Sequence, residues 1–423
     1  MPTKAPTRAK DPWRKPMPLA QFQRMLDLIH APSPVGLEGA MKAVALAQIQ
    51  EFMPDTWKIH HFGGSAGFVI DTMPEAGPDV LTVMAIGHMD KIRLVVRAVD
   101  KSGRIWVNSD SILPFTAIGH RVILYSEDPK VPGSWREIRG GVIGSHGAVH
   151  LAPVNFRDGA AGPKKDDLYL ELHLRGDDVL AQVNALGIRP GDVMIFDSPV
   201  RRGVGPNTIS GAYLDNALGC HGVLEVLFLL AANPIQKVRY LCGCATHEEI
   251  GMMGGVLLAH RFSPHIVIGV DVNHDFSGTA HQAAKNNPPI GMGNGVTIAT
   301  GSVCTPNLVT LLQRVAQDQK IPYQLDPVGR ITGTDAMAGW MAGVDAVTTS
   351  LGIPVIDMHT PVEAGNTKDV MALIYLLDGL LRRLDFEEVT PAHFHMAHPN
   401  LSLADEHGWV KPKSAAKKGA AKN

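Results

Sequence analysis

The chain has 423 residues, of which 45% are hydrophobic and 19% charged, a balance that excludes global disorder and allows a large core. Lys and Arg number 39 against 41 Asp and Glu, which excludes the charge bias of a protein that coats nucleic acid, and we expect no nucleic-acid partner. Four cysteines are too few for a disulfide framework, so we expect a reducing compartment and a cytoplasmic protein.

Both ends of the chain have compositions that are typical of segments without a stable fold. Residues 1–17 are rich in proline and lack an apolar run, which predicts a flexible arm and not a secretory signal. Residues 405–423 end in the lysine-rich stretch WVKPKSAAKKGAAKN and predict a basic, disordered tail. We find no stretch that is long and apolar enough to span a bilayer, and we expect no membrane partner.

The first part of the chain combines helical spacing with one buried strand. From residue 19 to residue 52 apolar residues recur at helical spacing, with a break at APSPVG (31–36). The segment DVLTVMAIGHMD (79–90) then predicts a buried strand that ends at His88 and Asp90.

The pattern changes between residues 91 and 206. Short β-type runs separated by turn residues occur there, namely IRLVVRAV, RIWVN, HRVILYS, GGVIG, LYLELHL and GDVMIFD. One helix is expected near residues 178–186. This pattern predicts an inserted, β-rich domain.

Helices and strands alternate again after the insert. We expect helices at 214–232, 253–262, 306–319 and 367–384, and strands at 238–246, 266–272, 346–350 and 355–358. Such alternation is typical of an α/β fold with a doubly wound, mainly parallel sheet. The main domain would then be discontinuous (18–90 and 207–390), with the β-rich insert at 91–206.

Acidic and histidine side chains follow several of the predicted strands. In an open α/β sheet, the residues beyond the carboxyl ends of the strands line a common ligand crevice. The residues expected there are His88, Asp90, Glu248, Glu249, Asp271 and His359, together with Asp215 at the start of a long helix. Singly, each has a structural explanation, since a lone histidine is usually structural and an Asp at a helix start is usually a cap. Together they predict a metal site.

Two histidines and three carboxylates suit a pair of divalent ions, and we expect Zn²⁺, with Co²⁺ and Mn²⁺ as alternatives. The adjacent residues Glu248 and Glu249 point in different directions at a strand end, so they are poorly placed as the opposed pair of a glycosidase. They are well placed for one to bind a metal while the other accepts a proton.

The chain resembles the tetrahedral, or deblocking and glutamyl, aminopeptidases, a family of metallopeptidases with two metal ions. The resemblance covers roughly residues 20–386. It rests on GHMD (87–90), GVIGSHGAVHL (141–151), GDVMIFD (191–197), YLDNALGC (213–220), HEEIGMMGG (247–255), VIGVDV (267–272), GTDAMA (333–338) and HTPVE (359–363), in the family's order and spacing.

The resemblance implies a role for each residue of the predicted site. His88, Glu249, Asp271 and His359 match metal ligands, and Asp215 matches the carboxylate that bridges the two ions. Asp90 matches the carboxylate that orients the first histidine. Glu248 matches the general base. In the family, this residue takes a proton from the water molecule that bridges the two metal ions, which leaves a hydroxide, and passes the proton to the leaving amine.

The resemblance also implies substrates and partners. The substrates would be short peptides, which lose their N-terminal residue. The inserted domain would be similar to a PDZ module and would help to build a dimer and a dodecamer.

Some residues depart from the family pattern. Lys91-Ile92-Arg93 replaces an acidic residue followed by Ile-Gly, and Asp357 stands beside His359 where an aromatic or basic residue is usual. Asp357 and His247 either add charge near the site or form ordinary hydrogen bonds. Asp335 either belongs to a loop that lines the pocket for the N-terminal residue or caps a turn.

Two other functions remain open from the sequence. A related amide hydrolase, such as a carboxypeptidase or an aminoacylase, could use the same scaffold, and a carboxypeptidase would need a cation to bind the substrate carboxylate. Candidates for that cation are Lys91, Arg93 and Arg330. A non-catalytic descendant that keeps its metals is the third possibility, although no ligand or base is missing.

Overall fold

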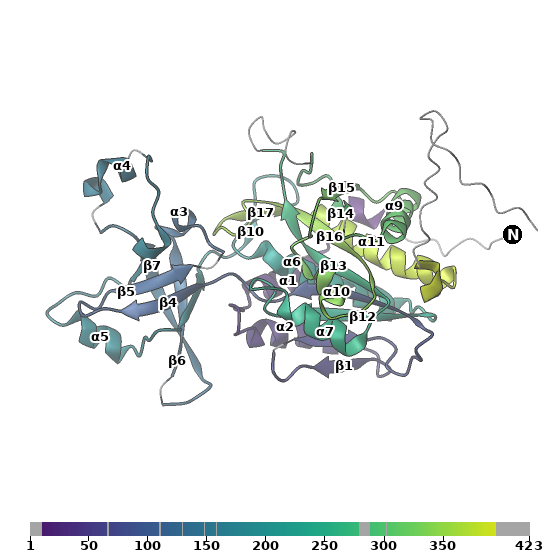
Figure 1. The fold of residues 1–423 in the computed structure, drawn as a ribbon, viewed down its shortest axis with the longest axis horizontal. Coiled ribbons are helices and arrows are strands. Elements are labelled where there is room, and N and C mark those ends of the chain that lie inside the picture. Colours follow the sequence, from purple (N-terminus) through teal and green to yellow (C-terminus); the bar gives the residue numbers. More distant parts are fainter. Residues whose placement is uncertain are drawn as a thin grey trace, which may run out of the picture.

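A computed structural model describes residues 11–394, apart from residues 66, 110, 129, 148, 158, 279–287 and 302. The predicted tail at 405–423 and the first ten residues of the predicted arm lie outside the described residues. The structure is mixed α/β, with a largely parallel central sheet and a separate antiparallel β-barrel (Figure 1).

The central sheet has eleven strands among the described residues, in the order β1-β2-β12-β3-β13-β16-β17-β11-β10, with β14 and β15 branching from β16. Its central strands β12, β3, β13 and β16 run parallel to one another. The strands are β1 (Lys58–His61), β2 (Phe68–Asp71), β3 (Leu81–His88), β10 (Arg201–Arg202), β11 (Thr208–Gly211), β12 (Val238–Ala245), β13 (Ile266–His274), β14 (Val296–Gly301), β15 (Tyr323–Val328), β16 (Val347–Ile356) and β17 (Glu363–Asn366).

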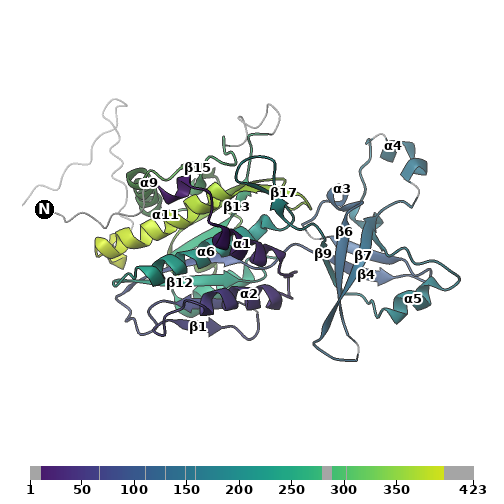
Figure 2. The ribbon, with the colours of Figure 1, turned by 180° about the vertical axis from the view of Figure 1, so that it is seen from behind.

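Helices cover both faces of this sheet because side chains alternate between the faces along each strand. On β3, Val83 and Ala85 pack into one core with α1 (Leu19–His30), α2 (Gly39–Gln50), α6 (Leu214–Ala232), α9 (Pro306–Gln319) and α11 (Thr367–Phe386). Met84 and Ile86 pack into the opposite core with α7 (Met253–Phe262) and α10 (Ala338–Met341). Figure 2 shows α1, α2, α6 and α11 over the first face.

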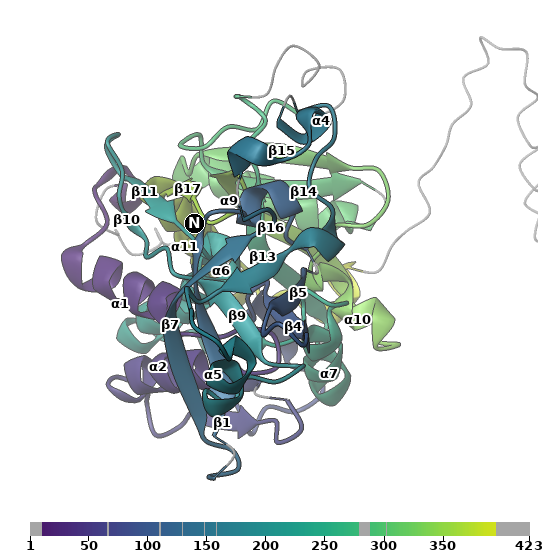
Figure 3. The same ribbon diagram turned by 90° about the vertical axis from the view of Figure 1, so that its left-hand side faces the viewer.

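The barrel closes in the order β4-β5-β8-β7-β6-β9, and every neighbouring pair is antiparallel. Each of the predicted β-type runs overlaps one of its strands, although GGVIG covers only the second half of β7. The strands are β4 (Leu94–Val99), β5 (Ile105–Ser109), β6 (Arg121–Glu127), β7 (Trp135–Gly144), β8 (Tyr169–Glu171) and β9 (Val193–Phe196). Short helices accompany them at α3 (Pro114–Ala117), α4 (Val154–Arg157) and α5 (Val179–Ala185). Seen end-on, the barrel lies in front of the main domain (Figure 3).

The edges of the insert differ from the prediction at one end. β10 falls inside the predicted insert, yet it pairs with β11 of the central sheet. The chain has therefore already returned to the main domain by residue 201.

The predicted strands at 346–350 and 355–358 are wrong, because the structure has one continuous strand, β16. Gly352 and Pro354 suggested a break, but β16 pairs with β13 along its whole length to Val355. A Cβ atom at Gly352 would lie 2.4 Å from Thr297 Oγ1, so glycine allows β14 to approach closely here.

The predicted arm is also partly wrong. Trp13 and Met17 are buried in the main core, and the Trp13 indole N–H donates to the Lys320 carbonyl oxygen at 3.1 Å. A single tryptophan near an end is enough to dock such a segment, because it buries a large apolar area.

Helix α6 corrects the expectation about membrane-spanning stretches. Among the described residues it is the one helix with the length and apolar composition to cross a membrane, and 83% of its most apolar window is buried inside the fold. It packs against β3, β13 and α11, which is the position of a core helix. The four cysteines are buried and free, so none forms a disulfide.

Candidate metal centre

The carboxyl edge of the central sheet gathers the predicted metal residues. His88 ends β3, Glu249 follows β12, Asp271 lies near the end of β13, His359 follows β16, and Asp215 lies in the first turn of α6. These segments meet because β12, β3, β13 and β16 are parallel neighbours, so their carboxyl ends share one edge.

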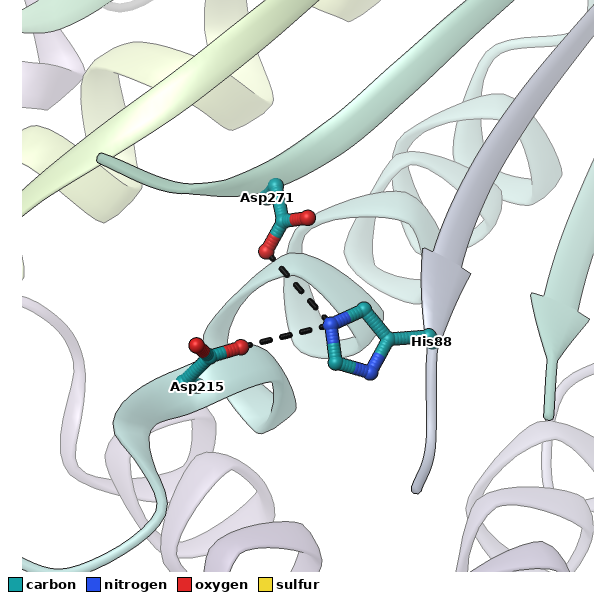
Figure 4. A group of neighbouring side chains, drawn as sticks. All are labelled: His88, Asp215 and Asp271. Carbon is teal, nitrogen blue, oxygen red and sulfur yellow. Dashed lines mark ion pairs between the residues drawn. The ribbon is translucent and has the colours of Figure 1, made fainter. Parts of the chain in front are cut away.

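One group of possible ligands consists of His88, Asp215 and Asp271 (Figure 4). The His88 Nε2 atom lies 3.2 Å from Asp215 Oδ1 and 3.6 Å from Asp271 Oδ1. All three side chains are buried. In Figure 4 both carboxylates point at the same imidazole nitrogen, which is the arrangement expected around a shared ion.

A second group consists of Asp215, Glu249 and His359. The His359 Nε2 atom lies 3.1 Å from Asp215 Oδ2 and 3.6 Å from Glu249 Oε2. Asp215 therefore presents one carboxylate oxygen to each group. The peptide bond between Asp215 and Asn216 is cis, and both residues depart from helical geometry at the start of α6.

Glu248 lies beside the first group without belonging to it. Its Oε2 atom is 3.7 Å from His88 Nε2, and the residue is 9% exposed. Burial raises the pKa of Glu248 well above its usual value, and the carboxylates of Asp271 and Asp335 raise it further, against the opposing effect of His88. A carboxyl group in this environment binds a proton readily.

Asp90 has a broader structural role than the sequence predicted. Its carboxylate lies 3.5 Å from His88 Nδ1, while its main-chain oxygen is closer to that nitrogen, at 3.1 Å. Its two carboxylate oxygens accept the backbone N–H groups of Glu248 and Glu249, each at 3.1 Å. Asp90 therefore fixes the turn that carries both glutamates as well as the histidine.

Glu363 is a site residue for which we had predicted no role. Its Oε2 atom accepts the backbone N–H groups of Leu214 (2.7 Å) and Asp215 (3.2 Å), and its Oε1 atom accepts that of His359 (2.9 Å). His359 has a φ of 63°, which is uncommon for a residue with a side chain. Glu363 therefore fixes the backbone of two candidate ligands, and the one available signal was an acidic residue four positions after His359.

Asp335 does not cap the turn, which was one of the two alternatives for it. Thr334 caps the short turn, since its side chain accepts the Ala336 N–H. Asp335 is 2% exposed, and neither carboxylate oxygen has a hydrogen-bond partner among the described residues. Burial raises the pKa of Asp335 to about 8.

The departures from the family pattern belong to neither of the two groups of possible ligands. Lys91 is buried, and its Nζ atom donates to the carbonyl oxygens of Ile29 and Ala31 at the end of α1. Arg93 donates to the Val35 carbonyl oxygen. His247 faces Glu38 at 3.7 Å, and the side chain of Asp357 is exposed.

The side chains of the centre fit two divalent cations. Burial raises the pKa of both Glu249 and Asp271. Burial also lowers the pKa of His88 and His359, but the surrounding carboxylates outweigh it and raise both above the usual value. The Glu249 Oε1 atom is buried without a hydrogen-bond partner among the described residues. These are signs of a carboxylate excess that positive charge would relieve, and the nitrogen and oxygen donors suit zinc-like ions.

Known proteins resemble the chain along most of its length. A lysyl aminopeptidase of Pyrococcus furiosus is 25% identical over 378 residues, which cover 88% of this chain and 100% of that protein. Among solved structures, a TET aminopeptidase from the archaeon Thaumarchaeota archaeon SCGC AB-539-E09 superposes with a TM-score of 0.77 at 20% identity, covering 89% of this chain and 99% of its own. The Pyrococcus horikoshii TET1 peptidase, which can assemble into a tetrahedron or a large octahedral shell, has a TM-score of 0.68 at 17% identity and covers 85% of this chain and 99% of its own.

The family itself is shown by a match to the sequence model of the M42 glutamyl aminopeptidases. The match runs from residue 67 to residue 376, well over half of the chain, and it contains the whole candidate centre. The chain therefore belongs to the M42 glutamyl aminopeptidase family and is an aminopeptidase of that metallopeptidase family.

Proposed function

We propose that this protein removes the N-terminal residue from short peptides by hydrolysis at a centre of two divalent metal ions. The observation that carries the proposal is Asp215, which presents one oxygen to each of the two groups of possible ligands. His88 and Asp271 would complete the first metal site, and Glu249 and His359 the second. Zn²⁺ is the ion we propose, with Co²⁺ or Mn²⁺ as alternatives.

The two ions, when bound, would polarise the scissile carbonyl group and lower the pKa of a water molecule. Glu248 would accept a proton from the attacking water, since it lies beside the first group and outside both ligand sets. It would then donate this proton to the leaving amine. The Asp90 carboxylate accepts the backbone N–H of Glu248 and so holds the base in position during the transfer.

The related carboxypeptidase reaction is less well supported. Lys91 is buried and its Nζ atom donates to two backbone carbonyl groups, while Arg93 donates to a third, so both cations are engaged by the backbone. A non-catalytic descendant would be expected to lack a base or ligand, whereas all the predicted residues are present and close together.

We also propose that the β-barrel insert, which the family resemblance implies is similar to a PDZ module, mediates self-association into a dimer and possibly a dodecamer. The support is the shell assembly of the Pyrococcus horikoshii relative, which shares the fold. The discontinuous domain formed by residues 18–90 and 207–390 would then carry the reaction, while the barrel would set its access to peptides.

The test uses protein stripped of metal and then supplied with Zn²⁺, Co²⁺ or Mn²⁺. Substrates are a panel of aminoacyl-p-nitroanilides and their N-acetylated counterparts. The proposal predicts metal-dependent release from the free-amine substrates alone. Release from the acetylated substrates would favour an acylase, and no release by protein that holds two ions would contradict the proposed function.

A further inference from the structure

A cleft of about 870 Å³ opens beside the turn that carries the two glutamates. Its volume lies within the range of about 300–1,000 Å³ that is usual for sites of small ligands. Five parts of the molecule line it: the loop between α1 and α2, the start of α2, the β1–β2 hairpin, the turn after β12, and the β6–β7 hairpin of the barrel. Its lining includes Pro34, Lys42, Phe62, Tyr125, Trp135 and His247.

The cleft lies at the same edge of the sheet as the candidate centre, beside the turn that carries Glu248. His247, which lines it, directly precedes Glu248. The β1–β2 hairpin is at this edge as well, because β2 pairs with the carboxyl end of β12 at Cys244. A ligand that begins at Glu248 can therefore extend past His247 into the cleft.

The barrel contributes an exposed aromatic side chain. Trp135 opens strand β7, pairs with Glu127 of β6 and is 42% exposed. This hairpin faces α2 and the β1–β2 hairpin across the cleft, since residues of all three line it. Exposed tryptophans on the wall of a cleft are frequent anchors for bound ligands, because they bury a large area with little loss of conformational freedom.

Lys42 is the cation of the cleft that lacks a counter-ion. The described residues place no carboxylate within 4.0 Å of its Nζ atom, although partial burial lowers its pKa. The two acidic residues of the cleft are engaged elsewhere: Glu38 accepts the Gly36 N–H at 2.7 Å and faces His247, and Glu137 is bound by Arg139 at 2.7 Å. A ligand carboxylate would supply the missing partner.

The position of Glu248 fixes the direction of a bound peptide. A general acid must lie within hydrogen-bond reach of the leaving nitrogen. The part of the peptide that leaves with this nitrogen therefore starts at Glu248, and the space open to it is the cleft beyond His247.

We propose that the cleft binds the leaving part of the substrate, with Trp135 packed on its side chains and Lys42 paired with its C-terminal carboxylate. This inference rests on the proposed aminopeptidase function. The barrel thereby becomes part of the substrate site.

The experiment compares three substrates with the same N-terminal residue: an aminoacyl-p-nitroanilide, a free pentapeptide and the same pentapeptide with an amidated C-terminus. The variants are Trp135→Ala and Lys42→Gln. Their matched controls are Phe115→Ala, which removes another exposed aromatic side chain of the inserted domain, and Lys101→Gln, which removes a lysine elsewhere on the surface; neither control residue lines the cleft. The metal-loaded, full-length protein is used throughout.

We expect Trp135→Ala to raise the KM of both pentapeptides about tenfold and to leave the p-nitroanilide unaffected. Lys42→Gln should abolish a preference of the unaltered protein for the free over the amidated pentapeptide. The two controls should change nothing. The p-nitroanilide rate of each variant also reports whether its metal centre is intact.

Two results would overturn the inference while leaving the proposed function in place. One is an equal effect of Trp135→Ala on all three substrates, which would place the N-terminal residue in the cleft. The other is no effect of either variant on the pentapeptides. If the unaltered protein hydrolyses none of the substrates, the proposed function itself fails and the inference fails with it.

Discussion

The central sheet and the barrel place their charged residues in opposite ways. At the carboxyl edge of the sheet, ionisable side chains are buried together, namely His88, Asp90, Asp215, Glu248, Asp271 and Glu363. In the barrel the core is apolar, and ion pairs such as Arg97–Asp166 and Arg139–Glu137 lie at the surface. Because an unpaired buried charge costs several kcal/mol, a fold keeps such a cluster only where something binds to it. The contrast therefore distinguishes the sheet edge, whose buried charges serve binding and catalysis, from the barrel, whose apolar core serves folding.

The largest effect should come from Glu248→Gln. The amide keeps the size of the side chain but cannot accept a proton, so kcat should fall about a thousandfold. Both metal ions should remain bound, which elemental analysis of the purified variant would show. Glu249→Gln is the matched comparison, since it should lose activity together with metal. If Glu248→Gln retained its activity, Glu248 would not be the general base.

Removing Glu363 should test whether the buried cluster depends on residues outside the ligand sets. Glu363→Ala leaves the N–H groups of Leu214, Asp215 and His359 without their acceptor. Each orphaned buried donor costs about 1–3 kcal/mol, and metal affinity should fall about 10–100-fold. Urea unfolding and titration against a chelator measure the two effects. The exposed Glu51→Ala serves as the control, and a variant that binds metal normally would show that His359 holds its position unaided.

The metal-free protein should lose stability as the pH rises from about 4 to 8. Burial raises the pKa of Asp335 to about 8, so the folded state keeps a proton that the unfolded state releases near pH 4. The folded state then binds more protons across this window, and the free energy of unfolding falls as the pH rises. Asparagine cannot ionise, so in Asp335→Asn the free energy of unfolding should decrease by a few kcal/mol less over this pH range than in the unaltered protein. Urea midpoints in the presence of a chelator measure it, with the exposed Asp166→Asn as control, and parallel curves for Asp335→Asn and the unaltered protein would contradict the burial argument.

Sequence patterns predicted most of the fold because its strands and helices are locally consistent. The barrel strands were found from alternating runs between turns, and α9 was found with its bounds because Pro306 marks its first turn. β16 was misread because Gly352 and Pro354 look like breaks, and only the pairing with β13 and the closeness of β14 explain them.

The candidate site was predictable to the extent that it depends on strand ends. The edge rule brought His88, Asp215, Glu249, Asp271 and His359 together, and the structure places them as two groups. Glu363 was missed because its partners are backbone donors up to 149 residues away, which leave no pattern in the sequence. The burial of Asp335 was not predicted because it depends on packing against Gly255, where a Cβ atom would come within 2.2 Å of its carboxylate.

The smallest effect should come from the barrel surface. Arg97 donates to Asp166 at 2.7 Å, but the Asp166 side chain is 86% exposed, so solvent competes for both partners. Arg97→Ala should change the free energy of unfolding by less than about 1 kcal/mol, and added salt should reduce the difference further. Urea unfolding at low and high salt measures both. A loss comparable to that of Glu363→Ala would mean that charges in the barrel also contribute to the core of the structure, and the distinction between the two regions would fail.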